Sequence, residues 1–248
     1  WLSEATVFVY DYDSKFNPTE YLRVIEQYKV NVFCAPPTVF RFLIKADIGH
    51  YDLSSLRHCC IAGEPLNAEV YNKWKQITGL ELREGFGQSE TAVLVATYPW
   101  LDAKPGSTGR PSPHFRAKLL DKDGNEVGPG EEGEICIPTK DGHPAGLTLG
   151  YYKDKKNTDA VLHDSWYHTG DMAWRDVDGY YYFIGRSDDV IKSSGYRIGP
   201  FEVESALLEH PAVLETAITA APDELRGQVV KATIVLKPGW EAGDALRK

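Results

Sequence analysis

The sequence predicts an α/β fold in which an α/β layer and a small antiparallel β-barrel are followed by a small α+β domain. Three observations support this. Apolar runs alternate with amphipathic helical patterns in the first third, and Asp-Gly turns separate short β-branched or aromatic runs in the middle. The last part reads as strand, helix, strand, strand. We place the α/β part in residues 1–98, the barrel-like part in 99–187, a hinge at 188 and the small domain in 189–248.

The first third contains two predicted helices and two predicted strands. The helices are expected over 19–30 and 68–79, where apolar residues share one flank and Gly79 provides a stop. The strands are expected within 30–37 and 57–65, because each is a short apolar run closed by proline or glycine, as in a buried parallel sheet.

The middle and last parts of the sequence show different secondary-structure patterns. We interpret the Asp-Gly pairs of the middle part as plain turns between antiparallel strands. After the hinge, Pro200 begins a predicted helix that ends before Pro211. Two strands are expected next, over 214–223 and 229–236.

Composition excludes several classes of protein. The net charge is −9, from 36 acidic and 27 basic residues, and no basic arm is present, so we expect no nucleic-acid partner. No apolar run is long enough to span a membrane. Four cysteines without a C-x-x-C pair favour reduced thiols rather than zinc or disulfides, as in a cytoplasmic protein. The chain begins with Trp-Leu rather than methionine, as a piece of a longer protein would.

Four polar segments carry the candidate chemistry. They are AGEP (62–65), GFGQSET (85–91), YHTGD (167–171) and GRSDDVIKSSGYR (185–197). Each borders an apolar run, and ligands of α/β proteins gather where strands end. Each alone reads as a turn, and GFGQSET has too much glycine for a good strand or helix. Together they offer an aromatic ring, hydroxyls, carboxylates and arginines, which suit a nucleotide and a divalent metal. The templates of P-loop, zinc-protease and nucleophile-elbow enzymes are absent.

These segments resemble the signatures of one family. GFGQSET is similar to Y-G-x-T-E, YHTGD to T-G-D, and residues 185–198 to G-R-x-D-D-x-x-K-x-x-G-x-R-I. Over essentially its whole length the chain resembles the adenylate-forming superfamily of acyl-CoA synthetases, luciferases and adenylation domains, and it is most similar to medium-chain acyl-CoA synthetases. The resemblance implies an AMP-forming acid–thiol ligase that uses ATP, Mg²⁺ and coenzyme A. Its small domain would rotate between adenylate formation and thioester formation.

The resemblance also implies a role for each matching position. For the nucleotide, these are Gly63, Glu64 and Pro65 lining the adenine, Phe86 stacking on it in place of tyrosine, and Asp171 and Arg186 contacting the ribose. For the chemistry, they are Ser89 (usually threonine) at the α-phosphate, Glu90 holding Mg²⁺, Arg197 near the phosphate, Asp188 as the hinge and Gly195 in the loop that meets pantetheine.

Gly87 carries the prediction about substrate size. In the acetate-specific branch of the family a bulky aromatic residue at this position closes the acyl pocket. Glycine leaves that space open, so we expect a medium-chain or aromatic acid, with roughly 0.8 kcal/mol gained per accommodated methylene.

Other interpretations remain open at this point. Arg197 could pair with Glu202 or Glu204 instead, Asp188 and Asp189 could be a solvated pair, and His168 is interpreted as structural. The chain could be an adenylation domain that loads a carrier protein, or a non-catalytic nucleotide-binding module; a homo-oligomer is compatible with either. The family's phosphate-binding loop and its C-terminal lysine do not occur in these 248 residues. We therefore expect the chain to be inactive alone.

Overall fold

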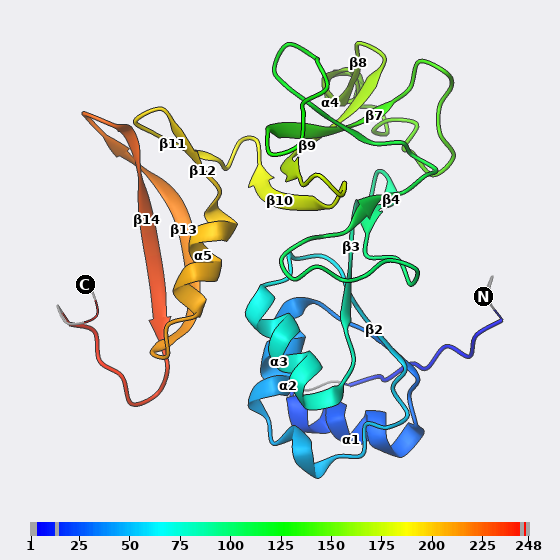
Figure 1. Cartoon of the computed structure of the whole chain (residues 1–248), viewed down its shortest axis with the longest axis vertical. Coiled ribbons are helices and arrows are strands. Elements are labelled where there is room, and N and C mark those ends of the chain that lie inside the picture. Colours follow the sequence, from blue (N-terminus) through cyan, green and yellow to red (C-terminus); the bar gives the residue numbers. More distant parts are fainter. Residues whose placement is uncertain (1–3, 13–14, 244–245, 247–248) are drawn as a thin grey trace. The chain divides into compact units, whose positions relative to one another are not determined.

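The structure is a computed structural model that describes residues 4–12, 15–243 and 246. The chain divides into two compact units, residues 1–85 and 86–248 (Figure 1). Strand β3 (Leu82–Gln88) runs from the first unit into the second. Among the described residues, no helix is long and apolar enough to cross a membrane.

The first unit is a parallel sheet with helices. Strands β1 (Val32–Cys34), β2 (His58–Ile61) and β3 lie side by side in that order, and both pairings are parallel. The helices are α1 (Pro18–Tyr28), α2 (Pro37–Lys45), the short 3₁₀ helix η1 (Ile48–His50) and α3 (Ala68–Thr78). This confirms the predicted α/β layer, including both predicted helices and both predicted strands.

The ends of α1 and α3 have local causes. Asn17 and Asn67 each begin a helix, because their side-chain oxygens accept hydrogen bonds from backbone N–H groups of the first turn. Gly79 ends α3 in the left-handed region with φ 75°. Helix α2 was not predicted. The Pro-Pro pair before it signals the end of a strand, but Pro37 also fits the first turn of a helix.

The core of the first unit lies between helices. Phe40 of α2 and Trp74 of α3 are both fully buried, and their rings meet edge to face with centroids 4.8 Å apart. Leu22 of α1 and Leu43 of α2 are also fully buried. The apolar flanks seen in the sequence are therefore the faces that pack.

The second unit begins with antiparallel strands, as the middle part of the sequence predicts. Strands β4 (Ala92–Ala96) and β5 (Arg110–Pro111) pair with each other. A second sheet has the order β10-β9-β7-β6, with β8 on β9. Its bounds are β6 Lys118–Leu120, β7 Glu132–Pro138, β8 Leu162–His163, β9 Trp166–Arg175 and β10 Tyr181–Arg186, with helix α4 (Lys155–Val161) before β8.

The remainder of the second unit is the predicted small α+β part. Strands β11 (Ile191–Ser193) and β12 (Tyr196–Ile198) form a hairpin, and helix α5 spans Pro200–Leu208. The long strands β13 (Val213–Asp223) and β14 (Gly227–Leu236) pair along their length, and the sheet order is β12-β11-β14-β13. This confirms the helix after Pro200 and the two strands that follow it.

Candidate functional site

The candidate site is built on strand β9, whose middle carries the T-G-D segment. Thr169 and Asp171 are 4% and 5% exposed, so this polar stretch is inside the fold. The Thr169 hydroxyl donates to the Ile135 carbonyl of β7 at 2.7 Å and accepts from the Asp171 backbone N–H at 3.0 Å. Gly170 between them has φ 73°, a left-handed conformation that glycine adopts without steric cost. The threonine and the glycine therefore determine where the Asp171 carboxylate lies.

Gln88 at the end of β3 connects this segment to the GFGQSET motif. Its amide nitrogen donates to the Asp171 Oδ2 atom at 2.6 Å and to the Thr169 carbonyl at 2.8 Å. Its amide oxygen accepts from the Tyr167 hydroxyl at 2.7 Å. Because Tyr167 donates to the oxygen, the nitrogen must face Asp171. No role was predicted for Gln88 from the sequence, because its partners Thr169 and Asp171 lie 81 and 83 residues away in the chain.

Arg186, the last residue of β10, is the positive charge of the site. Its Nη1 atom donates to the Thr169 carbonyl at 2.8 Å and lies 3.8 Å from Asp171 Oδ1. Its Nε atom lies 3.3 Å from Asp188 Oδ1. The guanidinium side chain is 46% exposed, so it can reach a ligand while it neutralises the buried carboxylate. Arg186, Asp171 and Asp188, all predicted site residues, are thus brought together.

Burial determines the acid–base behaviour of Asp171. Loss of solvent raises the pKa of its carboxyl group from 3.8 to about 6, and the nearby Arg186 and the Gln88 hydrogen bond oppose this rise. At pH 7 the group is therefore mostly a carboxylate, which accepts hydrogen bonds but cannot donate them. A partner that brings two hydroxyl donors, such as a ribose, matches this group.

Glu90 and Ser89 occupy the turn between β3 and β4. The Glu90 Oε1 atom accepts from the Tyr151 hydroxyl at 2.9 Å, and its backbone carbonyl accepts from the Thr148 N–H at 2.6 Å. Ser89 is exposed beside it. A single carboxylate of this kind, completed by phosphate oxygens and water, is the donor set that Mg²⁺ usually takes in nucleotide sites. The residues present therefore fit the metal that the family resemblance implies.

Two expectations about GFGQSET are wrong. The segment is not only a loop, because strand β3 continues through Gln88. The direction that a side chain on Gly87 would take is also not open: a Cβ atom there would lie 1.9 Å from the Ala92 carbonyl oxygen. Glycine is needed because the backbone folds back on itself at this turn. The space that was expected to admit a longer acid is therefore filled by the chain's own backbone.

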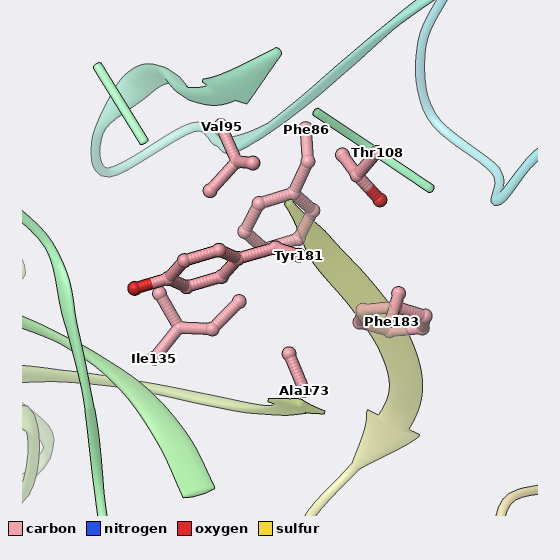
Figure 2. Close-up of a pocket in the computed structure, with 7 residues that line it drawn as sticks. All are labelled: Phe86, Val95, Thr108, Ile135, Ala173, Tyr181 and Phe183. Carbon is pink, nitrogen blue, oxygen red and sulfur yellow. The ribbon is translucent and has the colours of Figure 1, made fainter. Parts of the chain in front are cut away.

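Phe86, expected to stack on adenine, lies against the core of the second unit. Figure 2 shows its ring among Val95, Ile135 and Tyr181, next to Phe183. The Phe86 and Phe183 ring centroids are 5.9 Å apart. The ring is partly buried, so one portion packs in the core while another remains accessible.

A hydrogen-bonded group on β7 and β9 supports the T-G-D segment from behind. Glu134 accepts from the Gly170 N–H at 2.8 Å through Oε1, and its Oε2 lies 3.0 Å from His168 Nδ1. The Cys136 Sγ atom lies 3.5 Å from the same nitrogen. One donor atom from each of the three residues could in principle hold a metal ion, since these atoms lie within 4.8 Å of one another. However, burial raises the pKa of the Cys136 thiol, which disfavours the thiolate that a metal requires. We therefore interpret the group as structural support.

The other predicted residues lie elsewhere. Gly63, Glu64 and Pro65 belong to the first unit, after β2; Gly63 has φ 92°, and Glu64 Oε2 accepts from the Thr38 hydroxyl at 2.7 Å. Gly195, with φ 86°, forms the exposed turn between β11 and β12.

Arg197 is exposed on β12. Its alternative pairing with Glu202 or Glu204 does not occur among the ion pairs of the described residues, and Glu204 instead accepts from the Ile218 N–H at 2.9 Å.

Gly170 offers a direct test of this geometry. A Cβ atom at Gly170 would lie 2.8 to 2.9 Å from the Arg186 guanidinium, so Gly170→Ala should displace Arg186 as well as strain the backbone. Gly179 has a similar φ of 79° with nothing within 4 Å of the added atom, which makes Gly179→Ala a matched control. We expect Gly179→Ala to lose about 1 kcal/mol of unfolding free energy from backbone strain, and Gly170→Ala to lose more because of the added contact with Arg186. Only Gly170→Ala should also weaken AMP binding, measured by calorimetry; equal affinities would contradict the role of Arg186.

Comparisons with known proteins show the family to which the chain belongs. Residues 1–152 match the family described as AMP-binding enzyme, and residues 202–248 match the AMP-binding enzyme C-terminal domain. The chain therefore belongs to the AMP-binding enzyme family, as its motifs predicted.

Among curated proteins, the chain is 46% identical over 244 residues to the mitochondrial acyl-coenzyme A synthetase ACSM3 of Rattus norvegicus, covering 98% of this chain and 42% of that protein. It is 48% identical over 237 residues to 4-hydroxybutyrate–CoA ligase 1 of Metallosphaera sedula, covering 95% and 42%. The chain thus spans less than half the length of these relatives.

A solved structure has the same fold. The anthranilate CoA ligase AuaEII in complex with anthranoyl-AMP superposes with a TM-score of 0.83 at 35% identity, over 93% of this chain and 44% of that one. A second, MatB from Rhodopseudomonas palustris with ATP bound, superposes with a TM-score of 0.82 at 25% identity, over 93% and 45%. Both support the predicted fold class.

Proposed function

We propose that the chain is the nucleotide-binding portion of an ATP-dependent carboxylic acid–CoA ligase. Such an enzyme forms an acyl-adenylate from a carboxylate and ATP, releases pyrophosphate, and then passes the acyl group to the thiol of coenzyme A. The observation that carries the proposal is the buried Asp171 carboxylate, held by Gln88 and Arg186 beside the Glu90 turn. Membership of the AMP-binding family and similarity to acyl-CoA synthetases support it.

Each residue of the cluster has a distinct part in the proposal. Asp171 accepts hydrogen bonds from the ribose hydroxyls, and Gln88 keeps its carboxylate in place. Arg186 contacts the ribose from the exposed side, and Ser89 donates to the α-phosphate. Glu90 would hold Mg²⁺, which when bound neutralises phosphate charge. Donors that are already positioned are most effective where charge develops during the reaction.

The remaining assignments follow the family resemblance. We propose that Gly63, Glu64 and Pro65 line the adenine and that the accessible part of Phe86 stacks on it. We assign Arg197 to the phosphate, Asp188 to the hinge and Gly195 to the pantetheine loop. The exposure of Arg197 and Gly195 on the β11–β12 hairpin is compatible with contacts that form only after a rotation of the small domain.

For the acid, we propose a medium-chain or aromatic carboxylate. One similar protein is an anthranilate CoA ligase, which supports an aromatic acid, and another is a 4-hydroxybutyrate–CoA ligase, which supports an acid longer than acetate. Gly87 no longer supports this choice of acid, because the space where its side chain would lie is filled by the backbone of Ala92. Comparable rates of thioester formation with acetate and hexanoate, measured on the longer protein that contains this chain, would count against this choice.

Catalysis is proposed for the longer protein and not for this chain alone. We expect no carboxylate-dependent pyrophosphate release by the purified 248-residue chain, and such release would overturn this expectation. Several relatives are mitochondrial acyl-coenzyme A synthetases, so the cytoplasmic location stays a prediction.

Binding of AMP to the chain itself is the decisive experiment. Titration calorimetry should show a heat of binding for AMP. It should show much weaker binding of 2′,3′-dideoxy-AMP, which lacks both ribose hydroxyls. Leaving a buried carboxylate without these donors costs about 1.5–3 kcal/mol, or roughly tenfold to 100-fold in Kd. Equal affinity for the two nucleotides would contradict the role of Asp171. No binding of either would contradict the proposed function of this chain.

A further inference from the structure

Two cysteines of the first unit lie opposite each other on neighbouring strands. In the parallel pair of β1 and β2, Cys34 is the register partner of Cys60. Residues in register on adjacent strands project to the same face of the sheet. Cys59 precedes Cys60, so it projects to the other face, where it is fully buried. The chain thus holds one facing pair of thiols and one adjacent thiol that points away.

The two facing thiols are close together and can be reached. The Cys34 side chain lies near enough to Cys60 to influence its pKa, and Cys34 is exposed while Cys60 is partly buried. Burial, followed by the nearby Cys34, raises the pKa of the Cys60 thiol to about 12. Cys34 is therefore the thiol that a reagent in solution meets first.

The backbone spacing suits a bond between the two sulfurs. Adjacent strands lie about 4.7–4.9 Å apart, within the range of about 4.4–6.8 Å that Cα atoms span in disulfides. Strand β1 has three residues and stands at the end of the strand order among the described strands. Within the part of the chain that the structure describes, β1 pairs only with β2, so a small shift of this short strand can bring the two sulfurs together.

We propose that Cys34 and Cys60 form a dithiol site that a low-molecular-weight disulfide, such as oxidised glutathione, converts into an intramolecular disulfide. The Cys34 thiolate attacks one sulfur of the reagent, forms a mixed disulfide and releases one glutathione thiolate. The Cys60 thiolate then attacks the Cys34 sulfur and releases the second glutathione. The protein gives up two electrons and the reagent takes them, and the two protons of the cysteines end on the two glutathione thiols.

The site has a consequence for the neighbouring segment, and this part rests on the proposed function. Strand β2 ends at Ile61 and leads directly into Gly63, Glu64 and Pro65, the residues proposed to line adenine. A covalent bond from Cys60 to β1 restrains the strand from which this turn emerges. We therefore expect the reduced and oxidised chains to differ in their Kd for AMP.

Peptide mapping tests the bond without any need for activity. The 248-residue chain is incubated with oxidised glutathione, blocked with iodoacetamide and digested with trypsin without reductant. Cleavage after Lys29, Arg41, Arg57 and Lys73 places Cys34 in peptide 30–41 and both Cys59 and Cys60 in peptide 58–73. We expect these two peptides to be joined, in the wild type and in the Cys59→Ser variant alike, and the joined species to be lost in Cys60→Ser.

The controls distinguish a cysteine pair that the native fold holds together from random disulfide formation. In the Cys59→Ser variant the joined species can contain only Cys60, so its formation at the wild-type rate would identify Cys60 as the partner even if Cys60→Ser fails to fold. In urea the preference for Cys60 over Cys59 should disappear. Cross-linking should be faster at pH 9 than at pH 7, because the closing step needs the Cys60 thiolate.

Two results would overturn the inference: glutathione adducts on Cys34 and Cys60 that never join, or a link from Cys34 to Cys59 in the native chain. Failure of AMP to bind in either redox state would count against the proposed function instead. The mapped disulfide would still stand in that case, because its chemistry depends only on the two strands.

Discussion

Replacing Asp171 by asparagine is expected to stabilise the chain at neutral pH by about 2 kcal/mol and to weaken AMP binding at least about tenfold. The stabilisation arises because burial raises the pKa of this carboxyl from 3.8 to about 6, so ionisation at pH 7 costs folding free energy. Asparagine removes that cost. The loss of binding follows from the proposed role, since the amide supplies fewer acceptor sites to a ribose than the carboxylate does.

The stability difference between Asp171→Asn and the wild type should depend on pH in a defined direction. The pKa of Asp171 is higher in the folded chain than in the unfolded chain. Such a group makes its full contribution to stability when the pH is below its pKa in the unfolded chain. This contribution is lost as the pH rises through its pKa in the folded chain. The advantage of Asp171→Asn should therefore be absent near pH 4, grow between pH 4 and pH 6, and level off above. Urea unfolding of wild type and variant across this range measures it, with Asp141→Asn as an exposed control. A constant difference at all pH values would contradict the assigned cause.

Replacing Gly87 by alanine is expected to be among the most damaging single changes in the chain. The added Cβ atom would lie 1.9 Å from the Ala92 carbonyl oxygen and 2.8 Å from its carbonyl carbon, and both are backbone atoms that cannot rotate away. Such overpacking costs about 3 kcal/mol or more and should separate β3 from the start of β4. Because Gln88 follows directly, its hydrogen bonds to Asp171 and Thr169 should be lost too.

Calorimetric Tm values measure the effect of Gly87→Ala, and Gly49→Ala provides the control. Gly49 also lacks a left-handed φ, but nothing lies within 4 Å of its added Cβ atom. We expect a large fall in Tm for the first variant and almost none for the second. Similar Tm values would show that the turn adjusts to a side chain at Gly87, and would restore the interpretation in which this position can be larger in related enzymes.

The part of the fold that the sequence predicts is the part determined by local patterns. Helices α1 and α3 have apolar flanks, asparagine at the start and a left-handed residue at the end, so each can be predicted from a short stretch. Helix α2 was missed because Pro36 and Pro37 are ambiguous, since they can end a strand or begin a helix. The course of β3 was missed because its glycine is required by a contact with Ala92 and not by local flexibility.

In the candidate site, too, the residues in local motifs were predicted and the residues defined by distant contacts were missed. Asp171, Arg186 and Glu90 were found because each belongs to a recognisable motif. Gln88 was missed because its partner Asp171 is 83 residues away in the chain, and the Tyr151 contact to Glu90 spans 61 residues. Glu134 was missed for the same reason. Nothing in the sequence near Glu134 indicates that its carboxylate holds the Gly170 N–H.

Arg186 carries one more implication. Its single positive charge is divided between two anions, the buried Asp171 and the exposed Asp188. If the segment after Asp188 turns and carries Asp188 away, Arg186 loses one of its two carboxylate partners, and its attraction to Asp171 strengthens. The affinity of the chain for a ribose would then depend on the orientation of the segment after the hinge, and not only on the residues that contact the ribose. Asp188→Asn removes the competitor permanently, and would leave the chain responding as if the turn had already been made.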